Sequence, residues 1–173
     1  MIRHTLELDS VSKLLGACRK LVGHFKHSNV ASHALCERQK QERKKRTLYL
    51  LSEVPTRWNS TFDMLARLLA LHVPITPVLN DGRITKVADQ MLNLTAQQWK
   101  QGEDVCNLLE PLKGVTNSFS SSSDVTISTV LPLLFGLLDH CAEDDNESLF
   151  LSLLKAARHC YVLHFEINHF HAL

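Results

Sequence analysis

The sequence has 173 residues and a mass of 19.6 kDa, which suits one domain and is too short for two full domains. Hydrophobic residues make up 45% and charged residues 21%, which indicates a folded protein, because a disordered chain carries fewer apolar side chains and more net charge. The formal charge is +1, so only a local patch could attract a nucleic acid.

Composition excludes several other classes. No apolar run approaches the roughly 18 residues of a membrane-spanning helix, and the first residues lack the pattern of a signal peptide. The five cysteines are scattered without a C-x-x-C pair, so we expect an intracellular protein with reduced thiols. The sequence has no phosphate-cradling glycine loop, hydrolase elbow or H-E-x-x-H motif, so we expect no complete active site and no cofactor.

The first half of the chain predicts two helices and one ambiguous segment. Apolar residues at helical spacing predict an amphipathic helix over residues 8–25. Ser28 or Asn29 is the expected N-cap of a second, more polar helix that runs into a basic end at Arg46. Residues 47–51 are a short apolar run, which we interpret as a buried strand in preference to a helix segment.

The middle of the chain predicts two further helices. Several N-cap candidates in residues 56–61 precede a helical pattern over residues 62–72, which Pro74 should end. A loop or one-turn helix is expected over residues 75–79, followed by a turn at residues 80–82. Thr95 and Gln98 form a predicted capping box that opens a long helix, which Pro111 should kink.

The last third predicts more helix. A serine-rich flexible break is expected over residues 118–123, then a helix over residues 125–138 and an acidic loop over residues 143–147. A final helix is predicted over residues 148–157, and an aromatic, histidine-rich tail follows.

The densest charge cluster is basic. Residues 38–46 hold six basic groups and one acid, which could contact phosphates or act as a nuclear import signal. The alternative, equally weighted, is a solvated helix end whose cations favour the helix dipole. The candidate DNA contacts in this run are Arg43, Lys44, Lys45 and Arg46.

Metal binding is the less favoured interpretation of two histidine groups. His24 and His27, with His33 and Cys36, have residue types that zinc accepts, but structural sites of this size usually use a thiolate pair. We expect surface histidines and no metal here, and we extend that expectation to the C-terminal cluster of His159, Cys160, His164, His169 and His171.

Arg57 and Trp58 are the most informative pair. An arginine beside a tryptophan, in a polar turn that opens a helix, combines a phosphate donor with a platform on which an extrahelical base could stack. Composition alone favours a buried core tryptophan with Arg57 on the surface, because tryptophan is usually largely buried.

A family resemblance centres on the same pair. Residues 54–69, VPTRWNSTFDMLARLL, resemble the T-R-W-N-S-T signature of hAT-superfamily transposases and of the zinc finger BED domain-containing proteins derived from them. Further segments resemble the family order, and together they cover roughly residues 4 to 158: His4-x-Leu-x-Leu8, Leu21 to Ser28, Leu94 to Trp99, Leu108 to Leu112 and Thr126 to Pro132.

The resemblance implies a mainly α fold: a helical insertion of an RNase H-like transposase core, with at most one short strand. It implies a remnant of that core over residues 1–58, a partial insertion domain over residues 59–158, and an atypical tail over residues 159–173. None of the family's three catalytic acids has a matching position, and Met1 stands where the family has a cysteine. We therefore expect no enzymatic activity, since two-metal catalysis needs those carboxylates.

The resemblance also favours a functional role for Trp58, because the family tryptophan at this step is associated with stacking on a flipped base. Arg57 carries over as its neighbour, with a role at the phosphates. We expect a nuclear, DNA-binding remnant. The alternatives are a non-catalytic helical module that binds a protein partner or itself through exposed apolar faces, and a fragment of a longer nuclear DNA-binding regulator.

Overall fold

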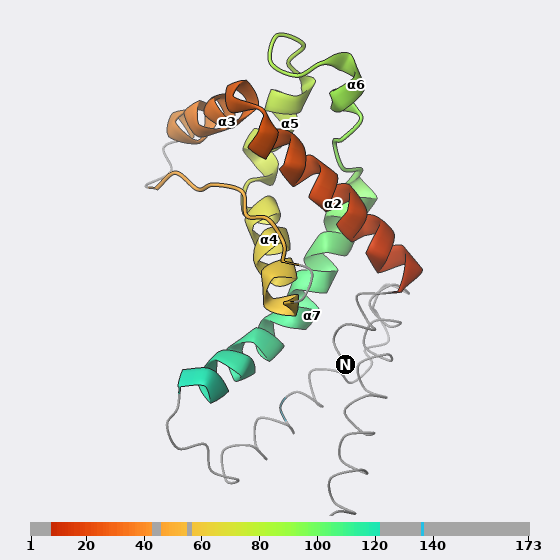
Figure 1. Cartoon of the computed structure of the whole chain (residues 1–173), viewed down its shortest axis with the longest axis vertical. Helices are drawn as coiled ribbons and strands as arrows, with labels where there is room; N and C mark the ends of the chain where they lie inside the picture. Colours follow the sequence, from red (N-terminus) through yellow and green to blue (C-terminus); the bar gives the residue numbers. More distant parts are fainter. Residues whose placement is uncertain (1–7, 43–45, 55–56, 122–135, 137–173) are drawn as a thin grey trace, which may run out of the picture. The chain divides into compact units, whose positions relative to one another are not determined.

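The computed structural model describes residues 8–42, 46–54, 57–121 and 136 (Figure 1). The chain separates into two compact units, residues 9–103 and residues 1–8 with 104–173. We call residues 9–103 the helical unit. All regular structure in the described part is helical, so the expected mainly α fold is confirmed.

Helix α2 (Asp9–His27) confirms the first predicted helix. Its apolar residues recur every three or four positions, which places them on one face. That face is the largest contribution to the core of the helical unit, with Val11, Leu14, Leu15, Cys18, Leu21, Val22 and Phe25 all buried. Leu8, which the pattern places on the same face, lies before the helix and is 36% exposed.

Helix α3 (Asn29–Gln41) begins where the sequence predicts and ends earlier. The Ser28 hydroxyl oxygen accepts a hydrogen bond from the Ala31 amide at 3.2 Å, which satisfies one free N–H of the first turn. The helix ends at Gln41, so the prediction that it continues to Arg46 is wrong. Its apolar face is narrow, with only Ala31 and Leu35 as buried apolar residues, and burial therefore does little to extend the helix into the charged run.

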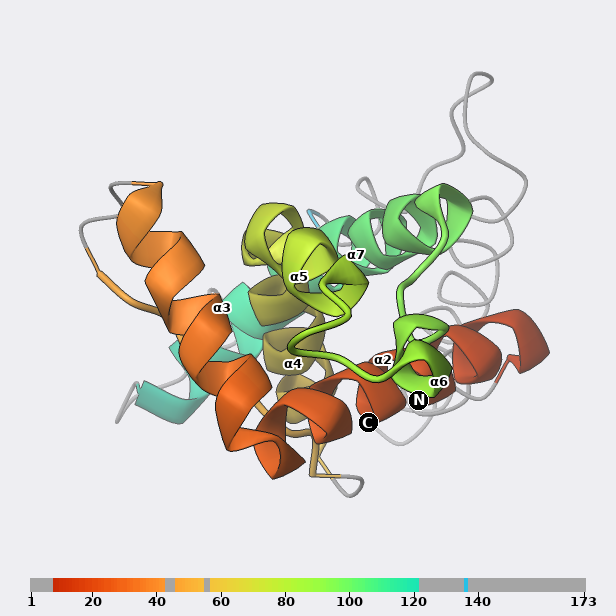
Figure 2. The same cartoon turned by 90° about the horizontal axis from the view of Figure 1, so that it is seen from above.

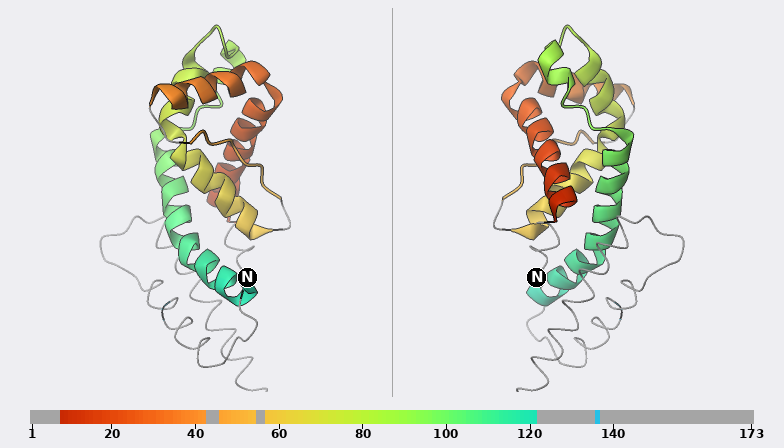
Figure 3. Two further views of the ribbon diagram at one scale, coloured as in Figure 1. Left: turned by 90° about the vertical axis from the view of Figure 1, so that its left-hand side faces the viewer. Right: turned by 90° about the vertical axis from the view of Figure 1, so that its right-hand side faces the viewer.

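The segment 46–54, which we call the linking segment, runs from the end of α3 to the start of α4 (Figure 3). The Leu48 amide donates to Gln39 Oε1 at 2.8 Å, and Gln39 Nε2 donates to the Leu48 carbonyl at 2.9 Å. Arg67 Nη1 donates to the Tyr49 carbonyl at 2.8 Å. The predicted strand over 47–51 is therefore wrong. Side chains pair with this backbone, and no second strand does so among the described residues.

Helices α4 (Trp58–Ala70) and α5 (His72–Asn80) meet at Leu71, which is fully buried. The prediction of a loop or single turn over 75–79 is wrong. Pro74 is the third helical residue, where no N–H partner is lost, so only Pro77 removes a helical hydrogen bond. Ile75, Val78 and Leu79 are completely buried, and this burial stabilises the helix despite Pro77.

Helix α5 is central to the packing of the helical unit. It contacts α3, α4 and α6 (Val87–Gln90), while α2 packs against α3 and α4. Figure 2 shows α5 between α3 and α6. The predicted turn after Asn80 is confirmed: the Ile84 and Thr85 amides both donate to the Asp81 carbonyl at 2.9 Å.

Helix α7 (Ala96–Ser121) runs from the helical unit into the second unit. The capping box is confirmed, because the Gln98 amide donates to Thr95 Oγ1 and the Thr95 amide donates to Gln98 Oε1. The helix continues through Pro111 and ends at Ser121, so the predicted break does not begin at Ser118. The predictions for residues 125–138, 143–147, 148–157 and 159–173 lie outside the described residues, apart from Gly136.

Within the described part, no helix on its own has the length and apolar character to cross a membrane. Helices α4 and α5 together meet that test of length and composition, with a bend of 71° between them.

The side chain of Gln39 should be a large contributor to the stability of the helical unit. Gln39 is completely buried, and Gln39→Ala leaves both the amide and the carbonyl of Leu48 without their partner. We expect a loss of about 1–3 kcal/mol in the free energy of unfolding, measured by urea denaturation. Gln41→Ala, on the exposed end of the same helix, is the control and should change stability little. Equal losses for both variants would contradict the role of Gln39.

Candidate nucleic-acid interface

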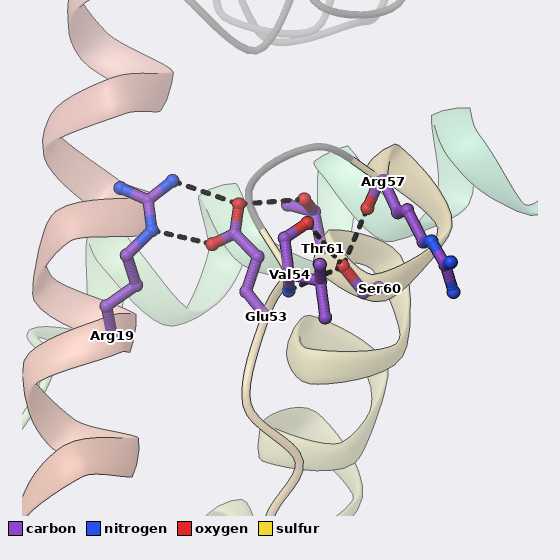
Figure 4. A network of polar contacts seen from close by, with 6 residues as sticks. All are labelled: Arg19, Glu53, Val54, Arg57, Ser60 and Thr61. Atoms are coloured by element: carbon purple, nitrogen blue, oxygen red, sulfur yellow. Dashed lines mark hydrogen bonds and ion pairs between the residues drawn. The ribbon is translucent and has the colours of Figure 1, made fainter.

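The turn before α4 is held by Ser60 (Figure 4). Its hydroxyl oxygen accepts a hydrogen bond from the Val54 amide at 2.8 Å, and its single proton is donated to the Arg57 carbonyl at 2.6 Å. The Arg57 amide donates to the Val54 carbonyl at 2.9 Å and closes the turn. One serine therefore ties both ends of residues 54–57 to the first turn of the helix.

A second anchor joins this turn to α2 (Figure 4). Arg19 binds the Glu53 carboxylate with two nitrogens, Nε at 2.6 Å and Nη2 at 3.1 Å, and Thr61 Oγ1 donates to the same carboxylate at 3.0 Å. The side chain of Glu53 is 7% exposed and that of Arg19 is 46% exposed. A two-point arginine contact fixes direction as well as distance, so it sets the position of the turn against α2.

These contacts and the burial of α2 shift the pKa values of two neighbouring side chains, Arg19 and Cys18. The hydrogen bond to the Glu53 carboxylate raises the pKa of Arg19, which stays fully charged. Burial raises the pKa of the neighbouring Cys18 thiol to about 12. Because the thiolate is the reactive form, Cys18 in the folded helical unit should react very slowly with alkylating reagents near pH 8.

Arg57 and Trp58 stand at the N-terminus of α4. Arg57 is exposed, caps the helix without a side-chain hydrogen bond, and extends away from Glu53 in Figure 4. Trp58 is the first helical residue and is partly exposed, whereas Trp99 is 7% exposed and packs against His72 with ring centroids 4.2 Å apart. Composition favours a buried Trp58 beside an exposed Arg57; Arg57 is exposed as expected, and Trp58 is only partly buried.

The amide groups of this helix start are also available. Among the described residues, neither the Trp58 nor the Asn59 N–H has a hydrogen-bond acceptor. A helix N-terminus with free amides carries partial positive charge and favours an anion. The exposed guanidinium of Arg57 adds a full positive charge beside them.

Only one candidate residue of the basic run, Arg46, lies in the described part of the chain. Arg46 is exposed at one end of the linking segment, and Arg43, Lys44 and Lys45 lie outside the described residues. Lys40 is held by Glu37 at 2.7 Å, so the positive charge of α3 is partly compensated. The eight residue steps from Arg46 to Val54 span about 26 Å when extended, so the linking segment can separate Arg46 from the start of the turn by that much.

The histidines of α2 and α3 form no metal-binding group, and the C-terminal cluster lies outside the described residues. Among the described residues, no three His, Cys, Asp or Glu side chains form a group that could hold a metal ion. The expectation of surface histidines is correct for His33, whose side chain is 78% exposed, and wrong for His24, whose side chain is 10% exposed. His24 lies 3.7 Å from Asp89 of α6, a contact that spacing along the sequence does not reveal.

Sequence reasoning missed the residues that hold the turn. Ser60 was one of several N-cap candidates, but Arg57 occupies the cap position and Ser60 binds the turn instead. Arg19 and Glu53 are 34 residues apart and carry no local signal. Only the family signature, which includes Ser60 and Thr61, marks part of this network.

Comparison with known proteins settles the family. Residues 1–108 match the model of the ZBED1 RNase-like helical domain. The match covers more than half of the chain. The chain belongs to this family.

Individual relatives agree with the ZBED1 RNase-like helical domain assignment. Zinc finger BED domain-containing protein 4 of Homo sapiens is 25% identical over 72% of the chain, and zinc finger BED domain-containing protein 6 of Homo sapiens is 33% identical over 76%. The alignments cover 10% and 13% of those proteins, so the chain spans about a tenth of their length. A protein named as a candidate transcriptional regulator, tpeD of Talaromyces stipitatus, is 31% identical over 57% of the chain and 12% of its own length.

These findings confirm the resemblance to the hAT-derived, BED zinc-finger type of protein. The matched region runs across residue 58, where we expect the boundary between core remnant and insertion. The boundaries after residues 58 and 158 stay predictions.

Removal of the Glu53 carboxylate should loosen the turn. Glu53→Ala leaves Arg19 and Thr61 without their shared acceptor, and we expect a loss of about 1–3 kcal/mol in the free energy of unfolding. Alkylation of Cys18 near pH 8, followed by mass spectrometry, should accelerate, because the negative charge of Glu53 adds to burial in raising the pKa of the Cys18 thiol. Glu37→Ala, which removes an exposed carboxylate from the Lys40 ion pair, is the control and should leave both measurements unchanged. Unaltered stability and labelling in Glu53→Ala would refute this role.

Proposed function

We propose that the chain is a DNA-binding, non-catalytic member of the family, and that Arg57 and Trp58 form its contact with an unpaired base. The observation that carries the proposal is the set of contacts that hold the described residues around the pair. Ser60 binds Val54 and Arg57, Glu53 binds Thr61, and Arg57 extends outward. Residues that are already held in place lose less entropy when a ligand binds.

The chemistry of the two residues fits a nucleic acid. The partly exposed indole of Trp58 offers a flat surface on which a base can stack, and stacking tolerates any base because each has a π face. The guanidinium of Arg57 and the free amides of Trp58 and Asn59 are donors for a neighbouring phosphate. The pair would therefore hold a base and its own phosphate together.

The basic run supplies a second, less specific contact in this proposal. Arg43, Lys44, Lys45 and Arg46 would bind the phosphate backbone at a distance from Trp58, and the affinity should then fall as salt rises. The same run can serve as a nuclear import signal. We accordingly place the protein in the nucleus, which is consistent with the BED zinc finger and regulator names of its relatives.

The proposal gives this chain a binding role without catalysis, as the family resemblance implies. In the proposal the chain descends from a transposase and keeps the DNA contact without the two-metal chemistry. The lengths of the relatives support the further proposal that this region acts inside longer nuclear regulators.

A helical protein-interaction module is the second candidate. Large apolar side chains are exposed on the helical unit: Val73 is 68%, Val87 is 76% and Met91 is 88% exposed. Such side chains favour a protein partner or self-association. Concentration-dependent association without DNA affinity would support this candidate over the first.

The DNA proposal is tested by anisotropy titration of a fluorescent DNA hairpin with one unpaired base, at two salt concentrations. Trp58→Ala should weaken binding by about 5- to 100-fold, the range expected for the loss of one stacked base. A fully paired duplex should respond much less. Neutralising Arg43, Lys44, Lys45 and Arg46 should weaken binding to both DNAs and reduce the salt dependence.

A matched variant separates the specific contact of Arg57 with DNA from the general effect of losing one positive charge. Arg83→Ala removes one exposed positive charge away from the turn, so it should have a smaller effect than Arg57→Ala. Circular dichroism of each variant confirms that the helices are intact. If folded wild-type protein binds neither DNA, or if Trp58→Ala binds the hairpin as well as wild type does, the proposed contact is wrong.

A further inference from the structure

A groove lies between α2 and the connection from α6 to α7, apart from the Arg57 turn. Its volume is about 470 Å³, and its lining comes from two short stretches of chain. From α2 come Lys13, Gly16, Ala17 and Lys20, and from the connection and the first turn of α7 come Met91 to Leu94 and Gln98. All of these residues belong to the helical unit.

The floor of the groove is formed by small residues in the interior of a helix. A glycine at such a position costs stability relative to alanine, because its backbone loses more freedom on folding. A Cβ added to Gly16 would meet no atom within 4 Å, so the described structure needs no glycine there for packing. Because Gly16 has no side chain, there is room for another backbone to approach α2 closely.

The rim of the groove is apolar on the α6 side. Met91 lines the groove and is 88% exposed, and Val87, one helical turn earlier, is 76% exposed. The two side chains therefore lie on one face of the α6 turn. Exposed methionine adapts its shape to a partner surface, and apolar side chains of this size gain from being covered.

The α2 rim is positively charged. Lys13 and Lys20 are seven residues apart, about 10 Å along the helix, and Gly16 and Ala17 lie between them. No Asp or Glu is among the lining residues, and Lys20 has no carboxylate partner among the described residues. Among the described residues, Lys13 pairs with the exposed Asp9 at 2.6 Å, which compensates part of its charge. An occupant should therefore carry negative charge along this edge.

We propose that this groove docks an amphipathic helix of a partner protein, with its apolar ridge over Gly16, Ala17 and Met91 and its acidic side chains toward Lys13 and Lys20. Two acids seven residues apart on one helix match the spacing of the two lysines. A nucleic-acid backbone would satisfy the lysines but would leave Met91 and Val87 uncovered. The apolar rim thus favours the acidic helix.

The test uses a fluorescent, amphipathic peptide of about 20 residues, with a leucine and alanine ridge flanked by glutamates seven residues apart. A matched peptide has lysine at each glutamate position. Anisotropy with the whole chain should show binding of the acidic peptide at least tenfold tighter than that of the basic peptide. Equal binding of the two peptides would overturn the proposal.

Variants locate the site. Gly16→Leu fills the groove and should weaken binding of the acidic peptide more than tenfold, while the helix itself becomes no less stable in urea. Lys20→Glu should weaken binding of the acidic peptide and strengthen binding of the basic peptide. A folding defect does not produce this reversal. Lys26→Glu makes the same charge change on α2 outside the groove lining and should do neither.

A competitor separates the two classes of ligand. Excess DNA hairpin should leave the bound peptide in place, since the groove and the Arg57 turn are distinct. Displacement of the peptide by DNA in wild-type protein, together with loss of DNA binding in Lys20→Glu, would assign the groove to nucleic acid and overturn the proposal.

Discussion

The structure depends on how a stretch of backbone without a sheet obtains its hydrogen bonds. Buried or half-buried peptide groups are costly when unpaired, and the linking segment has no partner strand among the described residues. Side chains replace that strand: Gln39 of α3 binds Leu48, and Arg67 and Ser60 of α4 bind Tyr49 and Val54. Arg19 of α2 adds a contact to the side chain of Glu53. The segment thereby connects three helices that also pack through their apolar faces.

The same kind of side-chain contact holds the described residues on either side of Arg57. The two residues before the turn are both anchored: Glu53 binds Arg19 of α2, and Val54 binds Ser60 of α4. Because these contacts hold the loop, the exposed side chain of Arg57 does not have to hold it. The Arg57 side chain makes no capping hydrogen bond and is therefore available to a ligand.

Hydrophobic periodicity predicts α2 down to the individual buried residues, and capping chemistry predicts the starts of α3 and α7, because both depend on neighbours within four positions. The errors arise where contacts with residues distant in the sequence determine the local structure. Residues 47–51 have a strand-like sequence, but Gln39 and Arg67 pair with them, and α5 contains two prolines yet is helical because its apolar face is fully buried. The family signature located the Arg57 turn, whereas the Arg19–Glu53 contact needed the fold.

Helix α2 relates the two surfaces to each other. At about 100° per residue, Lys13, Gly16 and Lys20 fall within about 60° around the helix axis, and Arg19 lies about 100° from Lys20. The core residues occupy the remaining face. One helix therefore contributes a buried stripe, an edge that anchors the Arg57 turn, and an edge that lines the groove. Because the edges are separate, a partner in the groove need not disturb Arg19 or Glu53, and both surfaces can be occupied in one molecule.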